Sequence, residues 1–364
     1  MNSSFSGVNF ERRVLDIYLR TACPASAACQ RRVRRVRRVL DPPECNAKSD
    51  TGLTALMFAC AKGFKDIVQM LLKHPDIDCN ARCNFGVTAL VNACHKGHKE
   101  VVQMLLNQPG IDGNVRCNDD GKTALMYACL HGKKDIVQIL LNHSDIDCNV
   151  RSNEGMTALM YAIQIGNKDI VQMLLNHSSI DCNVRNNEGM TALMYACEFC
   201  VYVHKNISLL PPLNQTDDLL ATNIQGQNAF ILAWKSEQTV TVQWFLDNFA
   251  EKLDFNVKDN NGNTAFLRAC KYGKFEIIEL LLQQKNIDFN ATNNNGRNGF
   301  WFACQWHNHH VVKTLLKYSK VVDIEIPECS ELSQEENDLV YNAILELYNF
   351  DVEITFKKCF RKIR

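Results

Sequence analysis

The chain has 364 residues, of which 46% are hydrophobic, and its 40 basic residues balance 40 acidic ones. This composition is ordinary for a globular protein, and zero net charge excludes a general attraction to nucleic acid or to an anionic membrane. No run approaches the roughly 20 apolar residues that cross a bilayer, so no membrane segment is expected. The 17 cysteines are an odd number in a long chain, which favours reduced thiols in an intracellular protein, cytoplasmic or nuclear.

Residues 1–9 are expected to be a flexible N-terminus, and residues 10–51 are predicted to form a capping repeat with a polar outer face. Its second helix has valines at every third position and arginines on its other sides. The arginines favour a solvated cap face, a nuclear import signal or a surface for an acidic partner. No aromatic residues alternate with them, so sequence-specific nucleic-acid binding is not expected. The run consists of Arg31, Arg32, Arg34, Arg35, Arg37 and Arg38.

A repeated segment follows the cap. Similar stretches such as GLTALMFAC and GMTALMYAC begin at Gly52, Gly86, Gly121, Gly155 and Gly189, whose numbers differ by 34, 35, 34 and 34. Looser versions begin at Gly226, Gly262 and Gly296, at further steps of 37, 36 and 34. Because one such unit cannot bury its apolar face alone, the repetition predicts a solenoid held by contacts between neighbours.

The fourth unit illustrates what each repeat is expected to form. Thr157 can cap a short helix that ends at Gly166, since glycine readily adopts the left-handed conformation. Asp169 stands at the start of a second helix, where the helix dipole favours a carboxylate. The polar stretch from Asp181 to Gly189 is typical of a turn. Each unit is thus predicted to contain a helix, a turn, a second helix and a projecting loop.

This pattern resembles the ankyrin repeat over roughly residues 42–325, in its G-x-T-A-L start, the A-C of the first helix, the V-Q-M-L-L of the second helix and the I-D-C-N before the loop. The resemblance implies an all-α solenoid of stacked helix-turn-helix units with projecting β-hairpin loops, about eight repeats and terminal caps. The family's T-P-L-H is T-A-L-M or T-A-L-V here, so histidine bonds between repeats are lost and weaker coupling is expected. The predicted repeats span residues 52–85, 86–120, 121–154, 155–188, 189–225, 226–261, 262–295 and 296–329.

Two regions depart from the repeat. Pro211 and Pro212 interrupt the second helix of the fifth repeat. This part of the chain is predicted to be a hinge, a binding loop or a decayed repeat. Residues 330–364 are predicted to form a C-terminal helix and basic tail, opened by a capping box at Ser333 and Glu336. That helix either caps the solenoid or recruits a partner, and the tail has no clear F-box or SOCS-box pattern.

The cysteines and histidines are interpreted as structural, and no catalytic motif is present. Cys197 and Cys200 form the only C-x-x-C, with His204 nearby, whereas a structural zinc site usually needs two such pairs. His307, His309 and His310 are expected in a solvated turn. We therefore expect neither enzymatic activity, nor a cofactor, nor a metal. Two sets of cysteines occupy equivalent positions in successive repeats, and each set, here called a column, is predicted to pack in the core. The first column consists of Cys60, Cys94, Cys129, Cys197, Cys270 and Cys304. The second column consists of Cys45, Cys79, Cys148 and Cys182, and Phe255 and Phe289 fill its position in later repeats.

Basic residues occupy corresponding positions of the projecting loops, and stacking is expected to align them along one edge of a groove. In ankyrin-like repeats an aspartate often follows this position and would partly neutralise its charge, but here only Lys258 is followed by one, Asp259. Binding of an acidic ligand is one interpretation, and ordinary loop chemistry is the other. The aligned residues are Lys48, Arg82, Arg116, Arg151, Arg185 and Lys258.

The resemblance implies a monomer that binds another protein on its concave surface. We therefore predict an adaptor whose groove over repeats one to four, about residues 48–190, binds an extended or helical segment of a partner protein, which is acidic on the first interpretation of the aligned basic residues. The alternatives are a nuclear regulator imported through residues 31–38, and an effector that recruits a degradation complex through the C-terminal tail. The resemblance also implies hydroxylation of loop asparagines, at Asn80, Asn149, Asn183 and Asn290.

Overall fold

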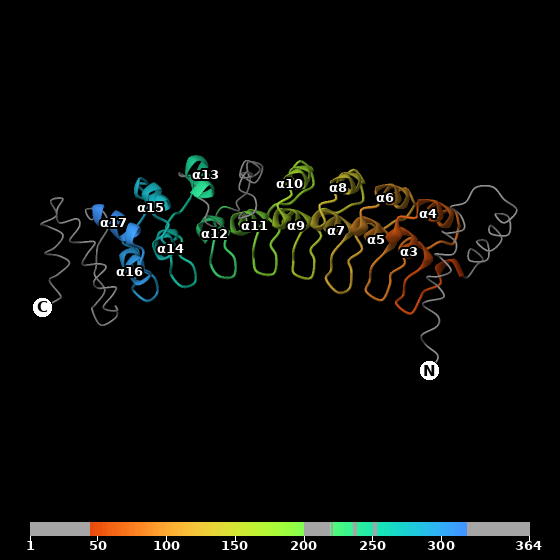
Figure 1. Cartoon of the computed structure of the whole chain (residues 1–364), viewed down its shortest axis with the longest axis horizontal. Helices are drawn as coiled ribbons and strands as arrows, with labels where there is room; N and C mark the ends of the chain where they lie inside the picture. The colour runs from red at the N-terminus through yellow and green to blue at the C-terminus, as the bar shows by residue number, and fades with distance from the viewer. Residues whose placement is uncertain (1–43, 200–218, 220, 236–238, 250–252, 319–364) are drawn as a thin grey trace, which may run out of the picture. The chain divides into compact units, whose positions relative to one another are not determined.

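The computed structural model describes residues 44–199, 219, 221–235, 239–249 and 253–318. Within these residues the chain forms one short 3-10 helix and fifteen α-helices and contains no strand (Figure 1). It divides into two compact units, Met1–Asn187 and Glu188–Arg364. The predicted cap helices with their arginine run, the prolines at 211–212 and the tail at 330–364 lie outside the described residues.

In the first unit the helices form two rows (Figure 1). After η1 (Glu44–Asn46), the first row contains α3 (Ala55–Lys62), α5 (Ala89–Lys96), α7 (Ala124–Leu130) and α9 (Ala158–Ile165). The second row contains α4 (Lys65–Leu72), α6 (Lys99–Leu106), α8 (Lys134–Leu141) and α10 (Lys168–Leu175). Each helix packs on the next one in its row and on its partner in the other row. This arrangement is the stacked helix-turn-helix solenoid that the sequence predicts.

The second unit repeats the same two-row plan. Its first row contains α11 (Ala192–Phe199), α12 (Ala229–Lys235), α14 (Ala265–Tyr272) and α16 (Gly299–Gln305). Its second row contains α13 (Thr239–Phe249), α15 (Phe275–Leu282) and α17 (His309–Lys317). Neighbours within each row are again in contact, and α12, α14 and α16 each pack on the second-row helix that follows them.

The residues that begin and end the helices act as the sequence predicts. Thr157 precedes α9, and its hydroxyl accepts a hydrogen bond from the backbone N–H of Met160 at 3.4 Å. Gly166 ends α9 at a φ of 73°, where a side chain would be strained. Asp169 lies in the first turn of α10, but its carboxylate accepts a hydrogen bond from Lys134 of the preceding repeat at 2.9 Å, which lowers the pKa of Asp169.

The cysteine columns follow the prediction in part. The six cysteines of the first column are completely buried, so this column is core packing. In the second column Cys45 and Cys148 are buried, but Cys79 and Cys182 are only partly buried, so the prediction of a buried column is wrong for these two residues. All twelve cysteines in the described part of the chain are free thiols.

Asparagines join neighbouring repeats of the first unit. The side-chain amide of Asn80 donates to the carbonyl of Gly110 at 2.7 Å, and its Oδ1 accepts from the backbone N–H of Asp112 at 2.8 Å. Asn46, Asn114 and Asn149 each make the same pair of bonds to the repeat that follows them. Because one amide satisfies two backbone groups of the next repeat, these residues couple repeats that lack the family's usual histidine.

A second point of coupling explains why each repeat begins with glycine. Gly86 has a φ of 73°, and a Cβ added to it would lie 2.7 Å from the backbone nitrogen of Asn118 in the next loop. That nitrogen donates to the carbonyl of Phe85 at 2.8 Å, and the Asn118 side chain donates to the carbonyl of Asn84 at 3.2 Å. Glycine therefore meets two demands at once, the left-handed turn and the close approach of the next loop.

Candidate protein-binding surface

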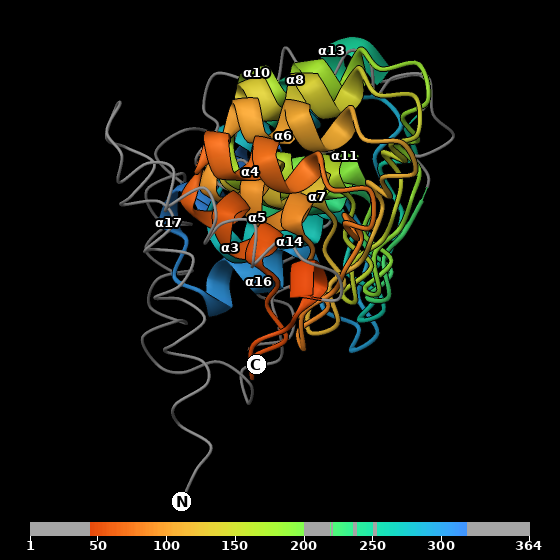
Figure 2. The ribbon, with the colours of Figure 1, turned by 90° about the vertical axis from the view of Figure 1, so that its right-hand side faces the viewer.

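The loops of the first unit project to one side of its helices. The loops that follow α4, α6 and α8 each connect a second-row helix to the next first-row helix, and the loop tips lie below the first row in Figure 1. The view along the rows shows the loops gathered on one side of both (Figure 2). Each loop closes through a backbone bond, such as Cys83 N–H to the carbonyl of Val87 at 3.1 Å. We define the loop face as the loops at residues 46–53, 78–87, 112–122 and 147–156, with the exposed side chains of the first-row helices.

The predicted basic residues are aligned on this face. Four of these side chains in the first unit reach the equivalent loop about one repeat further along the chain. Lys48 Nζ donates to the carbonyl of Arg82 at 2.9 Å, and Arg82 donates to the carbonyl of Arg116 at 2.7 Å. A guanidinium nitrogen of Arg116 donates to Asn153 Oδ1 at 2.9 Å, and one of Arg151 donates to Asn187 Oδ1 at 3.2 Å. We call Lys48, Arg82, Arg116, Arg151 and Arg185 the basic ladder.

The ladder side chains are exposed. The four side chains whose bonds are described above donate to carbonyl and amide oxygens, which are neutral groups. These bonds orient the cations without cancelling their charge. Arg185 is exposed on the fourth equivalent loop after that of Lys48. The first unit therefore presents a row of positive charge in a preset geometry.

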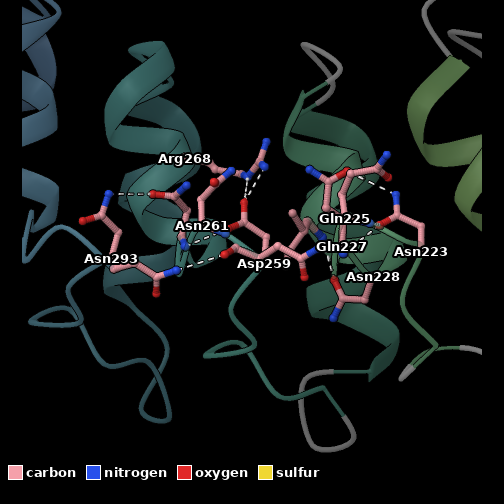
Figure 3. Close-up of polar contacts among 12 residues, drawn as sticks. Asn223, Gln225, Gln227, Asn228, Asp259, Asn261, Arg268 and Asn293 are labelled. Atoms are coloured by element: carbon pink, nitrogen blue, oxygen red, sulfur yellow. Dashed lines mark hydrogen bonds and ion pairs between the residues drawn. The ribbon is translucent and has the colours of Figure 1, made fainter.

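In the second unit Asp259 does not neutralise the basic residue before it. The Asp259 carboxylate is buried and accepts hydrogen bonds from Arg268 Nε at 3.0 Å and from the N–H groups of Asn261 and Asn263 at 2.9 and 2.8 Å (Figure 3). Lys258 instead donates to the carbonyl of Thr292 at 2.9 Å. The expectation that this aspartate offsets the charge of Lys258 is therefore wrong, since Asp259 pairs with α14.

The third loop is one residue longer than its neighbours and contains an additional network of hydrogen bonds. Asp120 accepts hydrogen bonds from the Tyr127 hydroxyl at 2.8 Å and from Lys122 Nζ at 3.1 Å. Burial works to raise the pKa of Asp120, but the bonds from Lys122 and Tyr127 outweigh it and the pKa is lowered. Burial and Asp120 together raise the pKa of Tyr127. Lys122 also lies 5.3 Å from the ring centre of Tyr161, so this network fixes the loop against α7 and α9.

Two further features of the loop face were missed by the sequence analysis. Phe85 lies in the second loop with 53% of its surface exposed. His95 in the last turn of α5 and His131 after α7 have ring centroids 4.4 Å apart. The only sequence signal for the pair is that both residues fall near the end of a first-row helix in successive repeats.

Comparison with known families adds the decisive observation. The family described as ankyrin repeats (3 copies) matches residues 25–117, 75–152, 112–186, 144–207, 199–293 and 230–328. The chain belongs to the ankyrin-repeat family. Ankyrin repeats are protein–protein interaction modules, and ankyrin-repeat proteins are typically non-catalytic binding scaffolds. A comparison with curated proteins finds no match.

The asparagines that the ankyrin resemblance marks for hydroxylation differ in their surroundings. Asn80 and Asn149 each bind the next repeat through both side-chain atoms. Asn183 and Asn290 are exposed, whereas Asn80 and Asn149 are partly buried. In all four, the backbone N–H donates to the aspartate two residues before it. An enzyme would have to break two bonds between ankyrin repeats to reach Asn80 or Asn149. Hydroxylation stays a prediction at all four positions.

The described ankyrin repeats offer no obvious metal centre. Within these residues no group of three or more histidine, cysteine, aspartate or glutamate side chains could hold a metal ion. Cys200 and His204 lie outside the described residues. His307 lies in the turn between α16 and α17 at a φ of 54°, and His309 and His310 begin α17. No helix in the described part of the chain is long and apolar enough to span a membrane.

Proposed function

We propose that this chain is an intracellular adaptor that binds an acidic segment of another protein on the loop face of its first four ankyrin repeats. The observation that carries the proposal is the basic ladder. Its exposed cations are aligned from loop to loop, and those of Lys48, Arg82, Arg116 and Arg151 are held by neutral oxygens of the next loop. Side chains that are already oriented lose little entropy when a ligand arrives, and this favours affinity.

The free thiols of the described cysteines support an intracellular setting. The exposed Phe85 supports recognition by apolar contact as well as by charge, since aromatic residues are enriched in protein interfaces. Import through residues 31–38 and recruitment of a degradation complex through residues 330–364 remain alternative predictions. They concern residues outside the described part of the chain.

Charge reversal of the ladder tests the proposal. We expect the full-length chain with Arg82, Arg116, Arg151 and Arg185 changed to glutamate to lose, at least about tenfold, the partner that wild type captures from cell lysate. A matched control changes four exposed lysines of the second-row side, Lys65, Lys73, Lys99 and Lys168, to glutamate. This control has the same net charge change and should keep the partner.

The ladder bonds also join repeats, so each variant must first be shown to unfold at a temperature close to that of wild type. A second variant with glutamine at the four arginine positions keeps polar donors and removes only the charge. Loss of the partner in both arginine variants, with retention in the lysine control, supports recognition by the ladder. Equal capture of the partner by wild type, both arginine variants and the lysine control would contradict recognition by the ladder.

A further inference from the structure

His95 and His131 form a pair of imidazoles on the loop-face side of the first-row helices. Their ring centroids are 4.4 Å apart, and the Tyr127 ring lies 5.6 Å from His95 and 6.2 Å from His131. His131 Nδ1 lies 2.9 Å from the carbonyl of Tyr127. A ring nitrogen that faces a carbonyl must be a donor, so His131 binds the Tyr127 carbonyl through Nδ1–H and not through Nε2.

The charged groups that shift the pKa of His95 are all basic. Burial lowers the pKa of His95, and His131, Lys96 and Lys133 lower it further. Lys96 lies on α5 itself, while His131 and Lys133 follow α7.

The other two helices packed on α5 do not reverse this balance. At the end of α3, Lys62 Nζ lies 5.6 Å from the Phe58 ring centre. At the start of α6, Lys99 is paired with Asp135 at 3.3 Å and Glu100 is exposed. The one nearby carboxylate of the third loop, Asp120, is engaged by Tyr127 and Lys122. The imidazole pair therefore lies in a basic environment.

We propose that His95 and His131 form a subsite for a carboxylate side chain of the partner, and that this subsite makes partner binding stronger as the pH falls. A carboxylate at the edge of the pair that bridges one ring N–H of each imidazole would accept a hydrogen bond from each and would offset the repulsion between them. Binding would then take up a proton from solution. This inference rests on the proposed function, because the arginine ladder would position the acidic segment and stay charged at every pH used.

The direction of the pH dependence follows from the linkage between proton binding and partner binding. In the free protein the basic neighbours keep His95 neutral near neutral pH, and a bound carboxylate favours its charged form. Affinity should therefore rise as the pH falls through the range in which histidine titrates, around 6.5. A rise of about one unit in the pKa of His95 on binding corresponds to about a tenfold gain in affinity. Aspartate side chains of a ligand, with pKa values of about 3.9, remain ionised in that range.

The test measures binding of a fluorescein-labelled oligo-aspartate peptide to the full-length chain at about pH 7.5 and about pH 5.5. Wild type should bind about tenfold more tightly at the lower pH. The His95→Gln/His131→Gln variant should keep the affinity at pH about 7.5 and lose the gain. A control, His74→Gln/His143→Gln, changes histidines that follow α4 and α8, away from the loop face, and should keep the gain.

The outcomes separate the subsite from the ladder. Binding that depends on the arginines but not on pH would overturn the subsite and leave the adaptor proposal standing. Equal pH gain in wild type and in the His95→Gln/His131→Gln variant would also overturn it. No binding of the peptide at either pH would contradict both the subsite and the choice of an acidic partner. If the double variant is unfolded by circular dichroism, the His95 ring is titrated by NMR in wild type, and an unchanged midpoint with saturating peptide overturns the subsite.

Discussion

Replacing Asp259 with alanine is expected to destabilise the second unit by about 3 kcal/mol, because it removes one partner of a buried ion pair. The Asp259 side chain is 1% exposed and that of Arg268 is 13% exposed. The change would leave the guanidinium without its carboxylate and two backbone N–H groups without an acceptor. All four tryptophans of the chain lie in this unit, so urea denaturation followed by tryptophan fluorescence reports on it.

The neighbouring repeats supply the control. Asn223 and Asn293 occupy the position of Asp259 and accept the equivalent N–H bonds, from Gln225 and Gln227 and from Asn295 and Arg297. Facing them, the first-row helices carry Leu232 and Phe302 where α14 carries Arg268. The double change Asp259→Asn/Arg268→Leu should therefore cost less than about 1 kcal/mol. A double variant as unstable as Asp259→Ala would show that the charge pair is not the source of the effect.

Replacing Gly86 with alanine is expected to destabilise the first unit by about 3 kcal/mol, from the left-handed backbone and from overlap with the next loop. The added Cβ would meet the backbone nitrogen of Asn118 at 2.7 Å, an atom that cannot turn aside. The bond from that nitrogen to the carbonyl of Phe85 would have to lengthen. Thermal denaturation followed by far-UV circular dichroism measures the change.

Gly110 is the matched control for Gly86. Its φ is 74°, almost the same as the 73° of Gly86, but a Cβ added there meets nothing within 4 Å. Gly110→Ala should therefore cost only the backbone strain, about 1 kcal/mol. The difference between the two variants measures the coupling between the second and third loops. Equal losses of stability would mean that the close approach of Asn118 contributes nothing.

The repeat and its helices were predictable because their signals are local. Threonine caps, the glycine that ends each first helix and the apolar spacing of the second helix all lie within about ten residues of what they determine. Thr157, Gly166 and the buried Ile170 and Leu174 are where the pattern predicts. The same signals recur in every repeat, so repeats with clear signals indicate the structure of a repeat whose own signals are weak.

The contacts between loops were less predictable, because each joins residues about one repeat apart. Alignment of the basic ladder followed from the repeat spacing alone, but the partner of each side chain did not. Asp259 lies next to Lys258 in sequence and yet pairs with Arg268, since the first aspartate oxygen is held by the turn and the second points toward α14. The residue at position 268 therefore determines whether the residue at position 259 forms an ion pair.

The partly exposed cysteines and the imidazole pair had no sequence signal strong enough to interpret. Cys79 and Cys182 occupy the column of the buried Cys45 and Cys148, and only side-chain packing distinguishes them. His95 and His131 fall one position apart in the register of their repeats, at the end of α5 and just after α7. Their contact depends on how neighbouring first-row helices pack, which spacing alone does not determine.

Site-specific photo-crosslinking tests the binding surface most directly. Phe85, 53% exposed in the second loop, can be replaced by p-benzoylphenylalanine, because the added benzoyl group can extend into solvent. Gln103, exposed on α6 in the second row, is the control position. Irradiation in cells should join a partner protein to the chain from position 85, and changing the four ladder arginines to glutamate should abolish the adduct. Crosslinks that form from position 103 and not from position 85 would show that the chain binds its partner on another surface.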